Sequence, residues 1–273
     1  MVYDGWKYSF KEISATINHH QPSTINHLPS TIHQMKLPEI IFENDDFIAL
    51  NKPAGLLSVP DRMQSAPSLK DLLVEKYQQI FTVHRLDRET SGIIIFAKTA
   101  ESHQFFSVIF QEREVEKTYH GIVWGVPATT SGTIELSMME HPAKNGTMIV
   151  HRKGKSASTG YEVVENFGKY AFMKFDLFTG RTHQIRVHMK ETGHPILCDP
   201  LYGDGKPVLV SSLKRNYNHS GFEEEKPILD RLALHSAKIS FTDLHGKQFA
   251  LEAEMPKDLR ALLSQMRKNL LKA

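Results

Sequence analysis

At residues 84–97 the sequence reads HRLDRETSGIIIFA, a polar run that passes directly into an apolar one. The apolar part, residues 92–97, does not alternate between polar and apolar positions, which is typical of a strand covered on both faces. We therefore expect a central strand there. The polar loop before it contains Asp87, and loops fixed to rigid strands commonly carry catalytic groups. Equally, charged side chains on such a loop can pair with one another at the surface.

Around this strand the sequence predicts a mixed α/β (α+β) chain. Helices are expected after Ser68, over 100–112, from a Thr182 cap to about Glu191, and from Pro256 with its leucines facing inward. A hairpin is expected over 40–50, and further strands at 119–124, 132–137, 148–151, 159–165, 170–178, 232–241 and 247–253. Because few strands are separated by crossover helices, the sheet should be mainly antiparallel.

Composition bounds the class of protein. The 273 residues carry a formal charge of +2 and a single cysteine, Cys198, so an intramolecular disulfide and a cysteine-based zinc cage are excluded. No stretch approaches the ~20 apolar residues that span a bilayer, and the N-terminus lacks the pattern of a signal peptide. We expect a cytoplasmic protein with no membrane contact.

The chain divides near residue 37. Residues 1–36 are polar and repeat a Pro-Ser-Thr-Ile unit, which predicts a flexible arm, and residues 37–273 have the composition of one globular domain. Four histidines of the arm could alternatively cluster on a metal: His19, His20, His27 and His33. Residues 211–231 resemble an insertion within the domain.

Arg186 is the second candidate for chemistry. On the helix expected after Thr182, Ile185 and Met189 set the buried face, and Arg186 lies at its border. A guanidinium there needs a carboxylate partner, and such a pair favours the ionised acid that a nucleophile requires. A structural ion pair or a side chain that reaches solvent is the alternative.

Spacing argues against a metal or cofactor. His183 and His188 are five positions apart and so point in different directions on a helix, whereas a metal pair needs a spacing of four. The Gly-Lys-Ser at 154–156 has Ile149 where a phosphate loop requires glycine. We therefore predict no bound metal and no cofactor.

Residues 142–190 contain nine Lys or Arg and three acidic residues, a local excess of six positive charges. Aromatic residues lie between the cations, so this region could follow a nucleic-acid backbone and stack on its bases. A solvated face of ordinary strands has the same composition.

The polar loop resembles the H-R-L-D-x-x-T-S-G signature of the RluA family of RNA pseudouridine synthases. Further matching motifs follow in family order: NKPAG at 51–55, KTY at 117–119, GRTHQIRVH at 180–188, GHPI at 193–196 with DPLYG at 199–203, and LALHS at 232–236. The resemblance extends over about residues 37–263.

This resemblance implies the pseudouridine synthase fold, with a long, mainly antiparallel sheet and a central RNA-binding cleft. It implies that uridines in structured RNA, ribosomal or transfer, are isomerised to pseudouridine without a cofactor. It also implies six site residues: Asp87 as nucleophile or base, Tyr119 stacking on the uracil, Arg186 paired with the aspartate, Leu234 packing the pocket, Arg85 entering the RNA stack, and Arg181 binding RNA.

The sequence also departs from the family. Many relatives carry an N-terminal S4 RNA-binding domain, for which 36 polar residues are too few, so a minimal form is expected. Cys198 stands where relatives often have glycine. No motif implies a protein partner, and a monomer is expected. The alternatives are a non-catalytic RNA-binding protein and a glycoside hydrolase, for which Glu89 would have to supply the second carboxylate.

Overall fold

The computed structural model describes residues 36–214, 217 and 224–271. The predicted arm, save Lys36, and much of the predicted insertion lie outside this part, so the division at residue 37 stays a prediction. The helices are α1 (Leu69–Lys76), α2 (Ala100–Gln111), α3 (Gln184–Glu191), α4 (Val210–Leu213) and α5 (Lys257–Leu270). The strands are β1 (Ile40–Glu43), β2 (Phe47–Lys52), β3 (Phe81–Thr82), β4 (Ser91–Ala97), β5 (Glu116–Trp124), β6 (Ser131–Glu135), β7 (Met138–Glu140), β8 (Met148–Val150), β9 (Ser158–Asn166), β10 (Tyr170–Leu177), β11 (Leu234–Thr242) and β12 (Gln248–Glu252).

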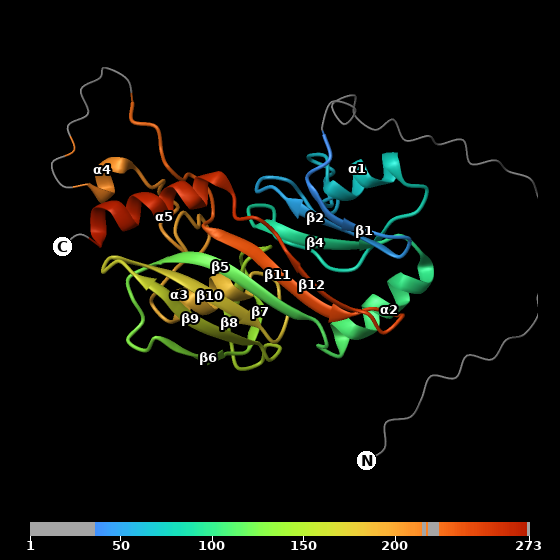
Figure 1. Cartoon of the computed structure of the whole chain (residues 1–273). Coiled ribbons are helices and arrows are strands. Elements are labelled where there is room, and N and C mark those ends of the chain that lie inside the picture. The colour runs from blue at the N-terminus through green and yellow to red at the C-terminus, as the bar shows by residue number, and fades with distance from the viewer. Residues whose placement is uncertain (1–35, 215–216, 218–223, 272–273) are drawn as a thin grey trace, which may run out of the picture.

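A ten-stranded sheet runs through the molecule in the order β1-β2-β4-β11-β5-β10-β9-β6, with β12 beside β11 and β3 beside β4 (Figure 1). Strand β11, which comes late in the sequence, lies between β4 and β5. It runs parallel to β4, whereas the other pairings between the named strands are antiparallel. The predicted fold class, a mixed chain with a mainly antiparallel sheet, is confirmed.

Strand β4 is covered on both faces, as its sequence predicts. All seven of its residues are buried. Ile94 and Phe96 pack in one core cluster with the apolar side chains of α1, whereas Ile93 and Ile95 pack in a second cluster with Phe106 of α2. This rigid double-sided packing fixes the start of β4, where the polar loop containing Asp87 ends.

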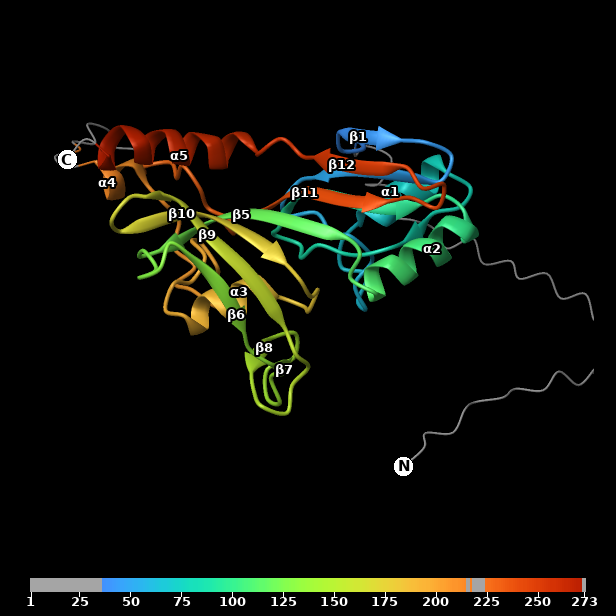
Figure 2. The same ribbon diagram turned by 60° about the horizontal axis from the view of Figure 1, so that its bottom comes forward.

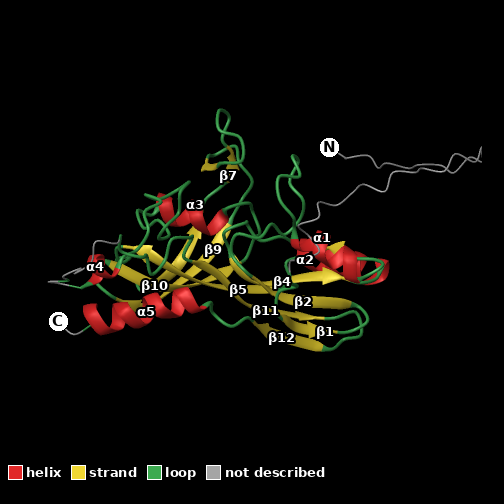
Figure 3. Cartoon of the chain, turned by 90° about the horizontal axis from the view of Figure 1, so that it is seen from above, coloured by secondary structure: helices red, strands yellow, loops and turns green. Residues whose placement is uncertain are grey.

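The other half of the sheet is also covered on two sides, by α3 on one face and α5 on the other (Figure 3). Helix α5 buries Leu259, Leu262, Leu263 and Met266, as its spacing predicts. The short β7–β8 hairpin projects away from the sheet (Figure 2). Among the described residues, no helix is both long and apolar enough to cross a membrane.

The predicted Thr182 cap is wrong. Helix α3 begins one residue later, because His183 is its N-cap and adopts the left-handed conformation, with φ of 56°. Gln184 instead fixes this end: its Oε1 accepts hydrogen bonds from Thr179 Oγ1 and Arg181 N, at 2.7 and 3.0 Å. Strands β3 and β7, with two and three residues, were not expected, since segments this short carry only a weak periodic signal.

Gly92 allows β4 and β11 to approach each other. Its φ is +114°, and a Cβ built on it would lie 2.1 Å from the backbone oxygen of Ser236. Gly92→Ala should therefore force the two strands apart and lower the free energy of unfolding by about 4 kcal/mol or more, measured by urea denaturation. Gly168→Ala is the control, because Gly168 has φ of +77° but open space around it, so its cost should be only about 1 kcal/mol. Equal losses in the two variants would contradict the close approach as the cause.

Candidate functional site

The site lies where the loops before β4 and β11 meet. Because these strands are parallel neighbours, their N-terminal ends lie at the same edge, which brings the Asp87 loop close to Leu234, the first residue of β11. Strand β5 adds Tyr119 and helix α3 adds Arg186. The loops, strands and helix enclose a cavity of about 580 Å³, and all six predicted site residues line it: Arg85, Asp87, Tyr119, Arg181, Arg186 and Leu234.

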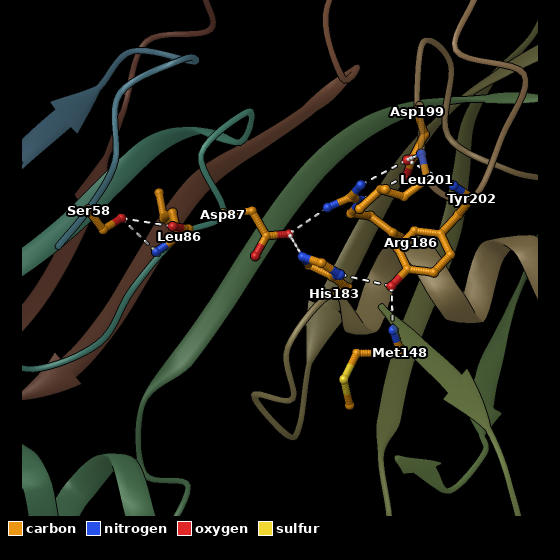
Figure 4. A network of polar contacts seen from close by, with 9 residues as sticks. All are labelled: Ser58, Leu86, Asp87, Met148, His183, Arg186, Asp199, Leu201 and Tyr202. Atoms are coloured by element: carbon orange, nitrogen blue, oxygen red, sulfur yellow. Dashed lines mark hydrogen bonds and ion pairs between the residues drawn. The ribbon is translucent and has the colours of Figure 1, made fainter. Parts of the chain in front are cut away.

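Arg186 joins two carboxylates (Figure 4). Its Nη1 donates to Asp87 Oδ2 at 3.1 Å, while its Nε and Nη2 donate to the two oxygens of Asp199, each at 2.8 Å. Asp199 is fully buried and also accepts from the backbone N–H groups of Leu201 and Tyr202. The predicted pairing with Asp87 is present, but the bidentate partner that fixes the guanidinium is Asp199, whose role was not predicted.

A second side of the network orients Asp87 (Figure 4). His183 Nδ1 lies 2.8 Å from the Tyr202 hydroxyl, and His183 Nε2 lies 3.7 Å from Asp87 Oδ2. The Arg186 guanidinium lies 5.0 Å from the centroid of the Tyr202 ring, within cation–π range. Burial lowers the pKa of His183, against the opposing effect of the Asp87 charge. The left-handed backbone of His183, a costly conformation, is thus compensated by contacts of its side chain.

The loop that carries Asp87 is held on both sides of that residue. Ser58 Oγ donates to the carbonyl of Leu86 at 2.8 Å and accepts from its N–H at 3.1 Å (Figure 4). On the other side, Gly55 N donates to the carbonyl of Arg88 at 2.9 Å. Because both neighbours of Asp87 are tied to the 53–58 loop, the carboxylate is held in place before any substrate arrives.

Lys52 is a buried part of this support. Its Nζ donates to three backbone carbonyls, those of Pro53, Leu56 and Arg88, at 3.0, 2.8 and 3.1 Å. The side chain is fully buried, and this burial lowers its pKa to about 7, against the raising effects of Glu89 and Asp87. The sequence placed Lys52 in a family motif but did not indicate this role.

The titration of Lys52 predicts a pH dependence of stability. Between about pH 7 and pH 10.5 the unfolded chain holds a proton that the folded protein has released, so unfolding free energy should rise with pH by up to about 1.4 kcal/mol per unit. Lys52→Met should remove this rise. Urea denaturation of both proteins at pH 6.5 and 9.5 tests it, since other titrating groups cancel in the comparison. Parallel pH profiles for the two proteins would show that Lys52 does not titrate in this range.

Tyr119 lies on the cavity wall in its neutral form. Burial raises the pKa of its phenol to about 12, a hydrogen bond with Ser236 lowers it, and the charge of Asp87 raises it. The side chain is buried against its strand neighbours, with Phe175 of β10 on one side and Ser236 of β11 on the other. At neutral pH it therefore offers an aromatic ring and a hydroxyl, not a phenolate.

The cavity lining carries more positive than negative side chains. Among the described residues that line this cavity, Asp87 is the one carboxylate, whereas the cations are Arg85, Arg113, Lys117, Arg181 and Arg186. Glu89 does not line it and lies 3.8 Å from Arg88 instead. The paired carboxylates that a glycoside hydrolase needs are thus not found within the described cavity.

The basic stretch 142–190 does not line the cavity as a whole. Arg181 and Arg186 are its cations there, and Arg181 is held by a hydrogen bond of 3.1 Å from its Nε to the carbonyl of Ser156. Lys174 lies elsewhere, with its Nζ 3.1 Å from Asp176, in a second cavity. Sequence composition could not show this division, because alternate residues of a strand point to opposite faces.

Comparison with known proteins agrees with these features. The family described as RNA pseudouridylate synthase matches residues 46–191. The dual-specificity RNA pseudouridine synthase RluA of Vibrio vulnificus (strain CMCP6) is 37% identical over 210 residues, which cover 74% of this chain and 77% of that protein. The ribosomal large subunit pseudouridine synthase D of Escherichia coli (strain K12) is 32% identical over 84% of this chain and 70% of that protein.

A similar fold occurs among solved structures. Human RNA pseudouridylate synthase domain containing 4 matches with a TM-score of 0.65 and 22% identity, over 84% of this chain and 93% of that chain. At this identity the likeness concerns the fold alone. It agrees with the predicted pseudouridine synthase architecture.

Proposed function

This chain belongs to the RNA pseudouridylate synthase family and isomerises uridine to pseudouridine in RNA, and we propose that Asp87 is the residue that carries the reaction. One observation supports this assignment above the others. Asp87 is the single carboxylate among the described residues that line the cavity, and a guanidinium anchored on a second, buried carboxylate holds one of its oxygens.

Two routes are open to this carboxylate. The reaction breaks the bond between uracil N1 and ribose C1′ and forms a bond between C5 and C1′. One proton leaves C5 and one proton is taken up at N1, so no atom is lost. Asp87 either attacks C1′ as a nucleophile or removes a proton from the sugar as a base. Its Oδ2 accepts from Arg186, while none of the described residues donates to Oδ1, which is therefore available to the substrate.

Besides Arg186, the other four predicted residues fit supporting roles. Tyr119 would stack on the uracil and assist proton transfer as a neutral phenol, and Leu234 would pack the apolar side of the pocket. The target base must leave the RNA stack to reach Asp87, a step that costs unstacking energy. Arg85, exposed at the rim, would enter the vacated position, and Arg181 would contact the RNA backbone.

We further propose ribosomal or transfer RNA as the substrate. The relatives named above include a dual-specificity enzyme and an enzyme of the large ribosomal subunit. The enzyme would then act in the cytoplasm, where these RNAs occur. We also propose that it acts as a monomer. Gel filtration tests the oligomeric state.

The test is pseudouridine mapping of total RNA from cells that lack the gene. We expect one or a few uridines to lose their modification, and the wild-type gene to restore it while the Asp87→Asn gene does not. Purified protein should modify the same positions in RNA from the deletion strain. If neither experiment detects pseudouridine at a position that depends on this protein, the proposed function is wrong.

A further inference from the structure

One wall of the Asp87 cavity carries two rings and two cations that the proposed reaction leaves unused. We name this set the aromatic-basic wall: His84, Phe110, Arg113 and Lys117, all of which line the cavity. They come from three segments, namely the loop before β4, the C-terminal end of α2 with the turn after it, and the start of β5.

The two rings of this wall lie against each other. The His84 and Phe110 ring centroids lie 4.9 Å apart with an interplanar angle of 20°, so the rings are stacked. His84 Nε2 accepts a hydrogen bond of 3.0 Å from Ile95 N, which places its proton on Nδ1. Burial lowers the pKa of His84 to about 3, so this ring stays neutral. A neutral stacked pair at a cavity wall is suited to contact with a nucleobase.

The two cations have no acidic partner among the described residues. Within the described part of the chain, neither Arg113 nor Lys117 lies within salt-bridge distance of a carboxylate. Lys117 Nζ lies 5.5 Å from the Phe110 ring centroid, and burial together with the Arg113 charge lowers its pKa. The dipole of α2 stabilises positive charge near Gln111, but its effect falls off within a turn, so it does not stabilise the charge of Lys117 on β5. An anion placed beside Lys117 and Arg113 would stabilise both charges.

A neighbouring cavity shows the contrast. A space of about 790 Å³ shares Arg113 and Lys117 with the Asp87 cavity. Its own lysines are neutralised, since Lys174 pairs with Asp176 at 3.1 Å and Lys238 pairs with Glu252 at 3.2 Å. A polyanion is therefore attracted to the Asp87 side of the shared cations.

We propose that the aromatic-basic wall binds the nucleotide next to the target uridine, with its base against His84 and Phe110 and its phosphate against Lys117 and Arg113. The proposal rests on the proposed function, because the uridine held at Asp87 defines which nucleotide is the neighbour. The wall would then help to select the sequence around the target.

The test uses the RNA fragment around a uridine identified by the mapping experiment. Phe110→Leu should raise KM about tenfold and change kcat little, because Phe110 would contact the base of the neighbouring nucleotide and not the target uracil. In RNA that lacks the base at one neighbouring position, 5′ or 3′, the wild type should show the same raised KM, and Phe110→Leu should add nothing further. Phe105→Leu is the control, since Phe105 packs on the same helix but does not line the cavity.

The cations have a separate readout. Lys117→Gln and Arg113→Gln should each reduce the magnitude of the slope of log affinity against log salt concentration, by up to about 0.7, the value for one phosphate of single-stranded RNA. Lys174→Gln, whose lysine is already paired, should leave the slope unchanged.

The proposal is overturned if Phe110→Leu leaves KM unchanged, or if its effect persists in full on both base-lacking RNAs. Unchanged salt slopes in Lys117→Gln and Arg113→Gln would overturn the phosphate contact. These failures differ from failure of the proposed function, in which the wild type itself modifies no RNA.

Discussion

Replacing Asp87 by Asn lowers kcat for pseudouridine formation by at least about 10³-fold, because the amide can neither attack C1′ nor take a proton. The substitution keeps the size of the side chain and its hydrogen bond from Arg186 Nη1. RNA affinity should therefore remain within a few-fold of wild type. Single-turnover assays and a filter-binding assay on the same RNA measure the two quantities separately.

Glu89→Gln provides the control for this experiment. Glu89 lies two residues away in the same loop but does not line the cavity, so its removal should leave kcat unchanged. Activity near the wild-type level in Asp87→Asn would refute the assignment of Asp87. A large loss in Glu89→Gln would instead favour paired carboxylates.

Replacing Arg186 by Met affects both activity and stability. Asp199 is fully buried and would lose its bidentate partner, so the free energy of unfolding should fall by about 3–5 kcal/mol. Asp87 would lose the group that holds Oδ2, and activity should disappear with it. Urea denaturation and a single-turnover assay measure these effects.

Two further variants separate stability from catalysis. Asp199→Asn added to Arg186→Met removes the unpaired buried charge and keeps the acceptor for Leu201 N, so stability should recover in part while activity stays absent. Arg267→Met breaks a bidentate pair with Glu165 at the surface and should cost no more than about 1 kcal/mol. An active, fully stable Arg186→Met protein would contradict the role given to this network.

Much of the site could be predicted because its residues lie in contiguous motifs. The buried strand after Asp87 was recognisable from six apolar positions, and the position of Arg186 on the helix required an acid nearby. What the helix could not show is that the fixed partner, Asp199, returns from a loop 13 residues later. One clue was available: a buried guanidinium has five N–H donors, which a single carboxylate cannot satisfy.

Other features depend on tertiary packing. Thr182 has a side chain suited to a helix cap. The contacts of His183 with Tyr202 and Asp87, however, hold His183 in the left-handed conformation, and the helix begins after it. The supporting role of Lys52 was not predicted because a lysine at a strand end is normally solvated, and only the fold shows that three carbonyls surround its amine.

The position of β11 between β4 and β5 affects how the enzyme folds during translation. A nascent chain that has emerged only as far as residue 233 holds Asp87, Tyr119 and Arg186 but not the strand that joins their supports. Until β11 inserts, one edge of β5 and the Ser91–Gly92 part of β4 lack their strand partner, and closing so long a loop is slow. We therefore expect catalytic competence to arise late, only after β11 has emerged and docked between β4 and β5.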